Sequence, residues 1–297
     1  MNNSNNSIIN LPPFFLRNKD INHMNIIQKI ILIICGKFFS LVVLFTEKKL
    51  FCLIINLFYR NDGRLIYHDN FYIKESKYGR KVAFVNKRVL RLVNNYDSQL
   101  QKFRDAYLLD MINFSDGETV IDCGANIGEL NISLKEKGLN LNYVAFEPDK
   151  EIFDCLKYNN PEENCILYNL GLSDKNTTQD FFIDSTGGNS SFVDFGVSEF
   201  KHVKVSRLDS IATNNKIKLL KVDAEGYEPE VLEGTEGIYE KIEYVSVDFG
   251  NERGVEQEST IVKVNKTLTD NGFSLIGLSE IRMVGLYRNN ISDENSS

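Results

Sequence analysis

The sequence lacks several patterns that define common classes of protein. It has no Trp, and the low counts of 5 Pro and 19 Gly among 297 residues exclude collagen-like and proline-rich chains. With only three His, and no C-x-x-C pair among five Cys, a Cys/His zinc site has almost no ligands. The odd number of Cys also argues against a disulfide framework, so we expect a reducing, cytoplasmic compartment.

Basic residues are in the minority, and they are unevenly distributed. The chain has 34 Lys+Arg against 41 Asp+Glu, a net charge of −7, so we expect no nucleic-acid partner. Residues 1–104 hold 17 basic and 6 acidic residues, whereas residues 105–297 hold 17 and 35. A basic first part (+11) and an acidic remainder (−18) suggest two units with different surroundings.

No uncharged run is long enough to span a membrane. Within the apolar segment 26–60, charged residues leave uncharged stretches of at most seven, nine and ten residues, below the 18 expected of a spanning helix. One interpretation is a buried helical pair. Another is a hairpin in the membrane interface, peripheral on the inner face, with its lysines at headgroup level. A true span is less favourable because a central Lys37 costs about 3 kcal/mol.

Periodicity predicts the organisation of the rest of the chain. Residues 1–25 form an Asn-rich, disordered leader, 61–95 a small strand-rich lead-in, 96–290 the main domain and 291–297 a disordered tail. In the main domain, helices expected near 96–112, 128–137, 149–159 and 227–237 alternate with strands, which implies a parallel sheet with helices on both faces. The expected strands are Thr119–Cys123, Asn142–Glu147, Cys165–Leu170, Ile217–Asp223, Tyr244–Asp248, Phe273–Gly277 and Met283–Arg288. The last two are close in sequence and should form an antiparallel hairpin, which gives an α/β, Rossmann-like, seven-stranded fold.

Two motifs point to a nucleoside ligand. In TVIDCGANIG a strand reaches Asp122 and Asn126 through a turn with Gly124 and Gly128, which lets the backbone approach a ligand beside a helix N-terminus. In YVAFEP, Glu147 ends the second strand, where a carboxylate can accept hydrogen bonds from ribose hydroxyls. This spacing is not the G-x-G-x-x-G dinucleotide fingerprint. Ser173 and Asp174 in LGLSD follow the third strand, where Asp174 could accept from an adenine amino group or simply form a turn.

Three further carboxylates follow the fourth and fifth strands. Asp223 and Glu225 in KVDAEGYE share one side by period-two alternation, at the edge where open α/β sheets bind ligands. Two close carboxylates suit a base for a hydroxyl proton or a shared metal site, although Glu225 could instead cap the next helix. Asp248 follows the fifth strand and, with Asp223 and Glu225, could ligate one divalent cation.

The motifs VIDCGANIG, AFEP, LGLSD, SRLDS and KVDAEGYEPEVLEG occur in the order typical of FkbM-type methyltransferases, which residues 95–290 resemble. The resemblance implies an O-methyltransferase that uses S-adenosyl-L-methionine on hydroxyls of sugars, glycans or secondary metabolites such as polyketides. It assigns Asp122, Gly124, Asn126 and Gly128 to the methionine part of the cofactor, Glu147 to the ribose and Asp174 to the adenine side.

By the same resemblance, Asp223 and Glu225 lie beside the methyl group. Asp248 stands where many members have Glu. We expect Asp223 or Glu225 to deprotonate or orient the acceptor hydroxyl. The alternative from another class is a non-catalytic, cofactor-binding or membrane-associated scaffold protein, which would bind the cofactor without turnover.

Overall fold

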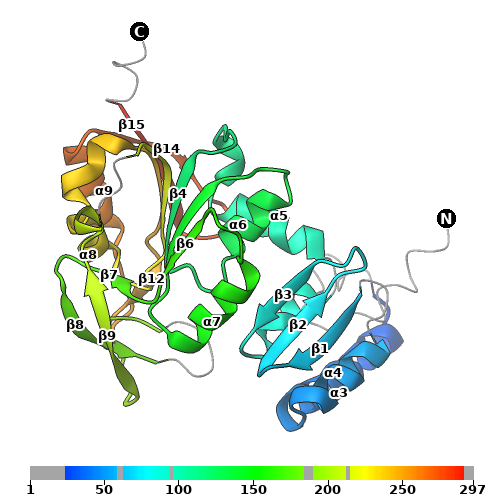
Figure 1. Cartoon of the computed structure of the whole chain (residues 1–297). Coiled ribbons are helices and arrows are strands. Elements are labelled where there is room, and N and C mark those ends of the chain that lie inside the picture. Colours follow the sequence, from blue (N-terminus) through cyan, green and yellow to red (C-terminus); the bar gives the residue numbers. More distant parts are fainter. Residues whose placement is uncertain (1–23, 59–62, 94–95, 184–189, 212–214, 291–297) are drawn as a thin grey trace. The chain divides into compact units, whose positions relative to one another are not determined.

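The computed structural model describes residues 24–58, 63–93, 96–183, 190–211 and 215–290 (Figure 1). Residues 1–23 of the leader expected over 1–25 lie outside the described residues, and so does the whole tail expected over 291–297. The chain divides into two compact units, Met1–Tyr96 and Asp97–Ser297. Each unit is described separately below.

The first unit combines a helical hairpin with a small sheet. Helices α3 (Ile26–Phe45) and α4 (Lys48–Phe58) are followed by strands β1 (Arg64–His68), β2 (Phe71–Glu75) and β3 (Lys81–Phe84), and by the 3-10 helix η2 (Lys87–Leu92). The three strands form an antiparallel sheet in the order β1-β2-β3. Helix α3 begins where the Asn25 side chain accepts from the Gln28 N–H and the Gln28 side chain accepts from the Asn25 N–H. This reciprocal capping box satisfies two backbone donors at the start of the helix.

The second unit is built on a seven-stranded sheet. Its strands are β4 (Thr119–Cys123), β5 (Asn142–Phe146), β6 (Cys165–Tyr168), β10 (Ile217–Val222), β11 (Ile242–Asp248), β14 (Phe273–Leu278) and β15 (Val284–Asn289). The sheet order is β14-β15-β11-β10-β4-β5-β6. Pairings from β11 to β6 are parallel, while β15 runs antiparallel to both β11 and β14. The predicted Rossmann-like sheet with a closing antiparallel hairpin is therefore confirmed.

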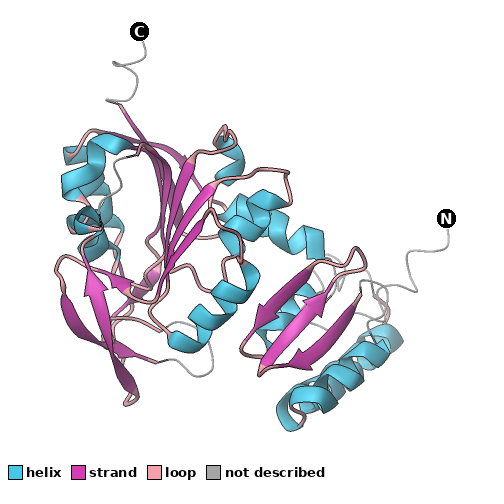
Figure 2. Ribbon diagram, viewed as in Figure 1, coloured by secondary structure: helices cyan, strands magenta, loops and turns pink. Residues whose placement is uncertain are grey.

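Helices cover both faces of this sheet (Figure 2). Helices α6 (Glu129–Lys135) and α7 (Lys150–Asn159), together with the end of α5 (Tyr96–Ala106), pack on one face through a core that includes Leu130, Leu156 and Val120. Helices α8 (Glu228–Glu233) and α9 (Ile261–Asp270) pack on the other face through a core that includes Val231, Leu268 and Val222. Apolar side chains on both faces explain why the central strands read as nearly continuous hydrophobic runs.

A smaller sheet occupies the insertion between the third and fourth strands of the main sheet. Its strands β7 (Gly171–Leu172), β8 (Thr177–Phe182) and β9 (Phe200–Ser206) are ordered β7-β9-β8. A hairpin of β12 (Asn251–Arg253) and β13 (Glu258–Ser259) follows β11. The remaining 3-10 turns are η3 (Leu109–Met111), η4 (Leu208–Ser210) and η5 (Glu236–Lys241).

The structure differs from the predicted elements at two places that matter for the site. The helix expected over 96–112 ends at Ala106, because Leu108 adopts the left-handed conformation with φ of 58° and the chain continues as η3. Helix α9 was not anticipated, since its β-branched residues do not resemble a strong helix former. It buries Val264 and Leu268 one helical turn apart, so tertiary packing outweighs the local propensity.

Candidate active site

The predicted motifs meet at one edge of the large sheet. Strands β4, β5, β10 and β11 run parallel, so their carboxyl ends point to the same side. The loop that carries Gly124, Asn126 and Gly128 follows β4, Glu147 follows β5, and Asp223 with Glu225 follows β10. This is the edge at which open α/β sheets bind their ligands.

The glycine loop is held between its two neighbouring strands. The N–H groups of Gly124 and Ala125 donate to the Phe146 carbonyl over 3.1 and 3.0 Å. On the other side, a Cβ atom at Gly124 would lie 1.9 Å from the Asp223 carbonyl oxygen, and Gly124 has a positive φ of 68°. Gly128, with φ of 88°, precedes α6, and a Cβ there would lie 2.1 Å from Nδ2 of Asn160. Both glycines are therefore required by packing inside the protein.

Glu147 fixes the same loop from the end of β5. Its Oε2 accepts the Asn126 N–H over 2.9 Å, and its Oε1 accepts the Asp149 N–H over 2.9 Å. The residue is only 6% exposed, and burial raises the pKa of Glu147 to about 8 despite these two hydrogen bonds. A carboxyl oxygen has a second lone pair beside the one that accepts an N–H, so Glu147 retains acceptor capacity for a hydroxyl.

Lys221, to which the sequence analysis assigned no role, forms a buried centre beneath the loop. Its ammonium donates to the Gly124 carbonyl over 2.9 Å and lies 3.0 Å from Oδ1 of Asp122 and 3.8 Å from Oδ2 of Asp223. Burial disfavours its charge, but the two carboxylates outweigh burial and raise the pKa of Lys221. A lysine two residues before the acid that follows a mostly apolar strand was the available signal, because such a residue needs a partner when buried.

Asp122 is engaged within the protein. Its side chain is 1% exposed, and its Oδ2 accepts from the Tyr143 hydroxyl over 2.7 Å while Oδ1 faces Lys221. Asp122 is thus linked through Lys221 to the Gly124 carbonyl of the loop.

Asp223 lies in a polar network that joins three distant parts of the sequence. Its Oδ2 accepts a hydrogen bond from the Tyr107 hydroxyl, and its Oδ1 lies 3.5 Å from an Arg282 terminal nitrogen. The Arg282 guanidinium also lies over the Tyr107 ring, 5.5 Å from its centroid. Neither Tyr107 nor Arg282 was proposed from the sequence. Both residues lie in segments that contain no recognisable sequence motif. The fold alone brings them to the end of β10.

Asp248 shares Arg282 with Asp223 as an ion-pair partner. Its side chain is 2% exposed, with Oδ2 2.5 Å from Nε of Arg282 and Oδ1 accepting the Gly250 N–H over 2.9 Å. Burial and the nearby Asp223 raise the pKa of Asp248 to about 6, although Arg282 opposes the shift. These contacts suit a residue that positions Arg282.

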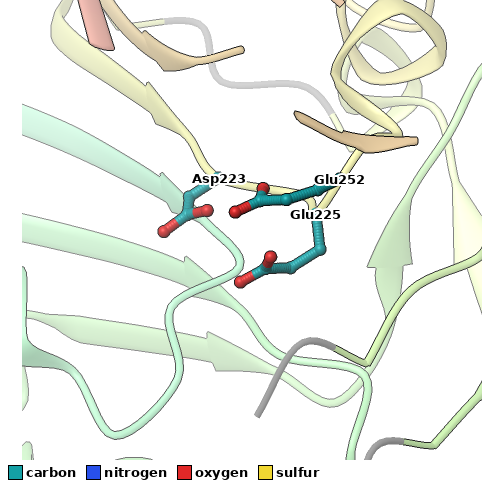
Figure 3. A group of neighbouring side chains, drawn as sticks. All are labelled: Asp223, Glu225 and Glu252. Atoms are coloured by element: carbon teal, nitrogen blue, oxygen red, sulfur yellow. The ribbon is translucent and has the colours of Figure 1, made fainter. Parts of the chain in front are cut away.

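A group of three carboxylates replaces the trio expected from the sequence (Figure 3). Asp223, Glu225 and Glu252 each offer an oxygen atom, and these atoms lie within 4.8 Å of one another. Glu252, on β12, thus takes the place expected for Asp248. Burial, Asp223 and Glu252 together raise the pKa of Glu225 to about 10, so it holds a proton at neutral pH. Oxygen ligands suit Mg²⁺ or Ca²⁺, but an acidic group alone does not define a cation site, and we assign no step to a metal.

The turn that carries Glu225 is held by a fourth acid. Glu225 has a positive φ of 51°. Oε1 of Glu228 accepts the N–H groups of Ala224 and Gly226 over 3.0 Å each, and its Oε2 accepts the Thr260 hydroxyl over 3.0 Å. Glu228 therefore satisfies two backbone donors of the turn that precedes α8, no side chain of the described residues caps α8 itself, and Glu225 is directed toward Glu252 and Asp223.

Ser173 and Asp174 lie beside the smaller sheet. Ser173 is fully buried; its hydroxyl donates to Oδ1 of Asp174 over 2.9 Å and lies 3.1 Å from the Tyr227 hydroxyl. The Asp174 carbonyl accepts from Arg207 over 2.8 Å. The Ser173 contacts are structural, whereas the half-buried Asp174 carboxylate keeps acceptor capacity for an adenine amino group.

The residues of this edge fit S-adenosylmethionine. A glycine loop anchored by Lys221 and Glu147 stands at the N-terminus of α6, and Glu147 retains acceptor positions for ribose hydroxyls. When bound, the cofactor supplies a methyl group on a sulfonium sulfur, which is a good leaving group. The sheet topology and this edge define the protein as a methyltransferase of the Rossmann-like class.

Comparison with known proteins identifies the family. Residues 122–275, just over half of the chain, match the methyltransferase FkbM domain. The chain therefore belongs to the FkbM methyltransferase family, as its motifs predicted, and is an S-adenosylmethionine-dependent methyltransferase.

Two curated relatives are also similar. Methyltransferase sdnD of Sordaria araneosa is 25% identical over 205 residues, which cover 56% of this chain and 77% of the relative. Methyltransferase 1 of Beauveria bassiana (strain ARSEF 2860) is 24% identical over 173 residues, covering 49% and 70%. Among solved structures, a SAM-dependent methyltransferase from Aquifex aeolicus matches with a TM-score of 0.39 and 14% identity, over 65% of this chain and 97% of that one.

Proposed function

We propose that the protein is an O-methyltransferase that methylates a hydroxyl of a sugar, glycan or related secondary metabolite. The observation that carries the proposal is the position of Asp223. Its partly exposed carboxylate lies at the end of the central strand β10, held by Tyr107 and flanked by the cations Arg282 and Lys221. A carboxylate fixed in this way can accept the proton of an acceptor hydroxyl as its oxygen attacks the methyl group.

The surrounding charges favour a neutral polyhydroxylated acceptor. Asp223, Glu225 and Glu252 offer oxygens within 4.8 Å of one another, and the carboxylates of Asp223 and Glu252 would repel a carboxylate or phosphate on the acceptor. Because Glu225 is protonated at neutral pH, it can donate to one hydroxyl oxygen while Glu252 accepts from another hydroxyl. Asp223 is thus proposed as the base, with Glu225 and Glu252 orienting the acceptor, and Asp248 positions Arg282.

The cofactor contacts are proposed on the same edge. Glu147 accepts from the ribose hydroxyls, the loop with Gly124, Asn126 and Gly128 borders the methionine part, and Asp174 accepts from the adenine side. Asp122 acts through the loop, because it is buried against Lys221. We also propose a cytoplasmic location, since all five cysteines are free, which fits a reducing compartment.

Replacement of Asp223 tests the base. In Asp223→Asn we expect turnover to fall by roughly 10²–10⁴-fold, while S-adenosylmethionine affinity stays within a few-fold. The measurement is S-adenosylhomocysteine release with a panel of hydroxylated sugars, followed by mass determination of the methylated product. Asp180→Asn, an exposed aspartate on β8 that pairs with His202, is the matched control.

Three results would contradict parts of this proposal. Full turnover in Asp223→Asn would remove Asp223 as the base. Methylation confined to amine or thiol acceptors would remove the O-methyl assignment. Cofactor binding without turnover on any class of acceptor would favour the non-catalytic scaffold instead.

A further inference from the structure

The helical hairpin of the first unit presents a broad apolar surface to solvent. On α3 and α4, large hydrophobic side chains are 37–77% exposed. We call this surface the hairpin face, and its residues are Ile26, Ile27, Ile30, Ile31, Ile33, Ile34, Phe38, Leu41, Leu44, Phe45, Leu50, Leu53, Leu57 and Phe58. Isolated exposed hydrophobic residues are ordinary, but a contiguous group of this size marks a surface that is covered by something else.

Packing within the unit does not need these side chains. Helix α3 buries a narrow stripe of Leu32, Gly36, Phe39 and Val42. At 100° per residue, Ile30, Ile34 and Leu41 lie on the opposite side of the helix from this stripe. Helix α4 likewise buries Phe51, Cys52 and Ile55 and leaves Leu50, Leu53 and Leu57 exposed. The exposed aliphatic residues are therefore surplus to the core of the unit.

The charges beside the hairpin face are almost all positive. Residues 26–58 contain four lysines, Lys29, Lys37, Lys48 and Lys49, and a single acid, Glu47. That acid is already bonded to Lys87 over 2.5 Å and to the Tyr72 hydroxyl over 2.8 Å. The lysine stems can lie along an apolar surface while their ammonium groups reach water or headgroups. An apolar face bordered by lysines complements a bilayer with anionic headgroups.

A bilayer fits this composition better than a protein partner does. The cores of protein interfaces are enriched in aromatic residues, Met and Arg and depleted in Lys. The hairpin face is mostly Ile and Leu with three Phe, and residues 26–58 contain four Lys but no Tyr, Trp, Met or Arg. We propose that the hairpin face docks the protein in the interface of an anionic membrane.

The contacts of α3 favour a helix that lies in the plane of the interface. Helix α3 has 20 residues with a mean hydropathy of 2.1 and is long and apolar enough to cross a bilayer. However, Lys87 of η2 donates to the Val43 carbonyl over 2.6 Å. On α4, the Asn56 side chain exchanges two hydrogen bonds of 2.7 Å with the Leu65 backbone of β1. The hairpin is thus tied to η2 through α3 and to β1 through α4, and a span would have to break these contacts.

Vesicle binding of the full-length protein tests the docking. The probes are vesicles of phosphatidylcholine alone and of phosphatidylcholine with phosphatidylglycerol, read out by co-sedimentation. We expect stronger partitioning onto the anionic vesicles, weakened by salt. The variant Ile30→Gln/Ile34→Gln/Leu41→Gln should lower this partition coefficient by at least about tenfold. Val262→Gln on α9, at a still more exposed position outside the hairpin face, should leave it unchanged.

A second variant guards against a folding artefact. Lys48→Gln/Lys49→Gln keeps the hairpin face intact and should remove the preference for anionic lipid. S-adenosylmethionine affinity, measured by titration calorimetry, should be the same in all variants, because the cofactor residues lie in the second unit.

Four outcomes would overturn the docking proposal. The first is no vesicle binding by the folded full-length protein, and the second is equal binding by the triple variant. The third is resistance of the bound protein to an alkaline carbonate wash, because such resistance would indicate a spanning helix. The fourth is a dimer in solution that the triple variant abolishes without vesicle binding, which would assign the hairpin face to a second copy of the chain.

Discussion

At the scale of single residues, environment gives similar acids different roles. Asp223 faces two cations and the Tyr107 hydroxyl, Asp248 is buried against Arg282, and Glu225 lies beside other carboxylates. Cations favour the charged form of an acid, whereas burial next to other acids favours the neutral form. The proposed base, Asp223, and the proposed proton donor, Glu225, therefore lie side by side at the end of β10.

The proton held by Glu225 has a consequence for stability. Its pKa is raised from 4.5 to about 10, so the folded protein keeps a proton that the unfolded chain loses above about pH 4.5. Stability should therefore fall as pH rises through this window. Glu225→Gln, which is neutral at every pH, should flatten part of that decline and raise the urea midpoint more at about pH 9 than at about pH 5.

Urea unfolding across this pH range measures the effect. Glu233→Gln, a substitution of an exposed glutamate at the end of α8, is the control and should leave the slope of stability against pH unchanged. Equal slopes for the unsubstituted protein and for Glu225→Gln would show that Glu225 is ionised in the folded state.

The sequence predicted part of this site. Asp223, Glu225 and Glu147 could be named because each directly follows an apolar strand and lies in a motif. Tyr107, Arg282 and Glu252 could not, since Tyr107 is 116 residues and Arg282 is 59 residues from Asp223. Such contacts are set by the packing of α5, the β14–β15 turn and β12 onto the sheet edge. Lys221 is the first residue of the motif KVDAEGYE, but its partners Gly124 and Asp122 became clear only from the fold.

At the scale of elements, the loop after β4 is the most constrained connection. It contacts the ends of β5 and β10. The Lys221 ammonium donates to its Gly124 carbonyl, and the Glu147 side chain accepts from its Asn126 N–H. Its shape therefore depends on backbone packing as much as on any ligand. We therefore expect even a small increase in side-chain volume in this loop to disturb the proposed cofactor site.

Gly124→Ala tests this dependence. The added Cβ would meet the Asp223 carbonyl oxygen at 1.9 Å in a left-handed conformation, so we expect a loss of about 3 kcal/mol of stability. Cofactor affinity should fall by at least about tenfold. Gly138→Ala is the matched control, because Gly138 also has a positive φ of 85°, but a Cβ added there would meet no atom of the described residues within 4 Å. It should lose only about 1–2 kcal/mol and keep its affinity, and similar losses in both variants would contradict the packing argument.

The seven strands of the large sheet were predictable because each is a short apolar run ended by an acid, a glycine or a turn. Helix α9 was not, because the β-branched Ile261, Val262 and Val264 suggest extended structure, and only Val264 of these three is buried in the core beside α8. The edge strand β1 was also not delimited. Its polar and apolar residues alternate only weakly, and its position depends on a hydrogen bond from the Asn56 side chain of α4.

At the scale of the whole molecule, the proposed chemistry and the proposed membrane docking belong to separate units. The second unit holds the sheet edge with the proposed cofactor and catalytic residues, and the first holds the hairpin face. The charge difference between the two parts of the sequence follows the same division. Loss of membrane docking and loss of catalysis should therefore be separable by point substitution.

The central claim is that Glu147 and the glycine loop form a cofactor site. Titration calorimetry of S-adenosylmethionine and S-adenosylhomocysteine into the full-length protein tests it most directly, with Glu147→Ala as the test variant and Glu151→Ala, on the exposed first turn of α7, as the control. The account predicts affinity in the micromolar range that is lost in Glu147→Ala and kept in Glu151→Ala. No heat of binding from the folded protein, or equal affinity in both variants, would contradict it.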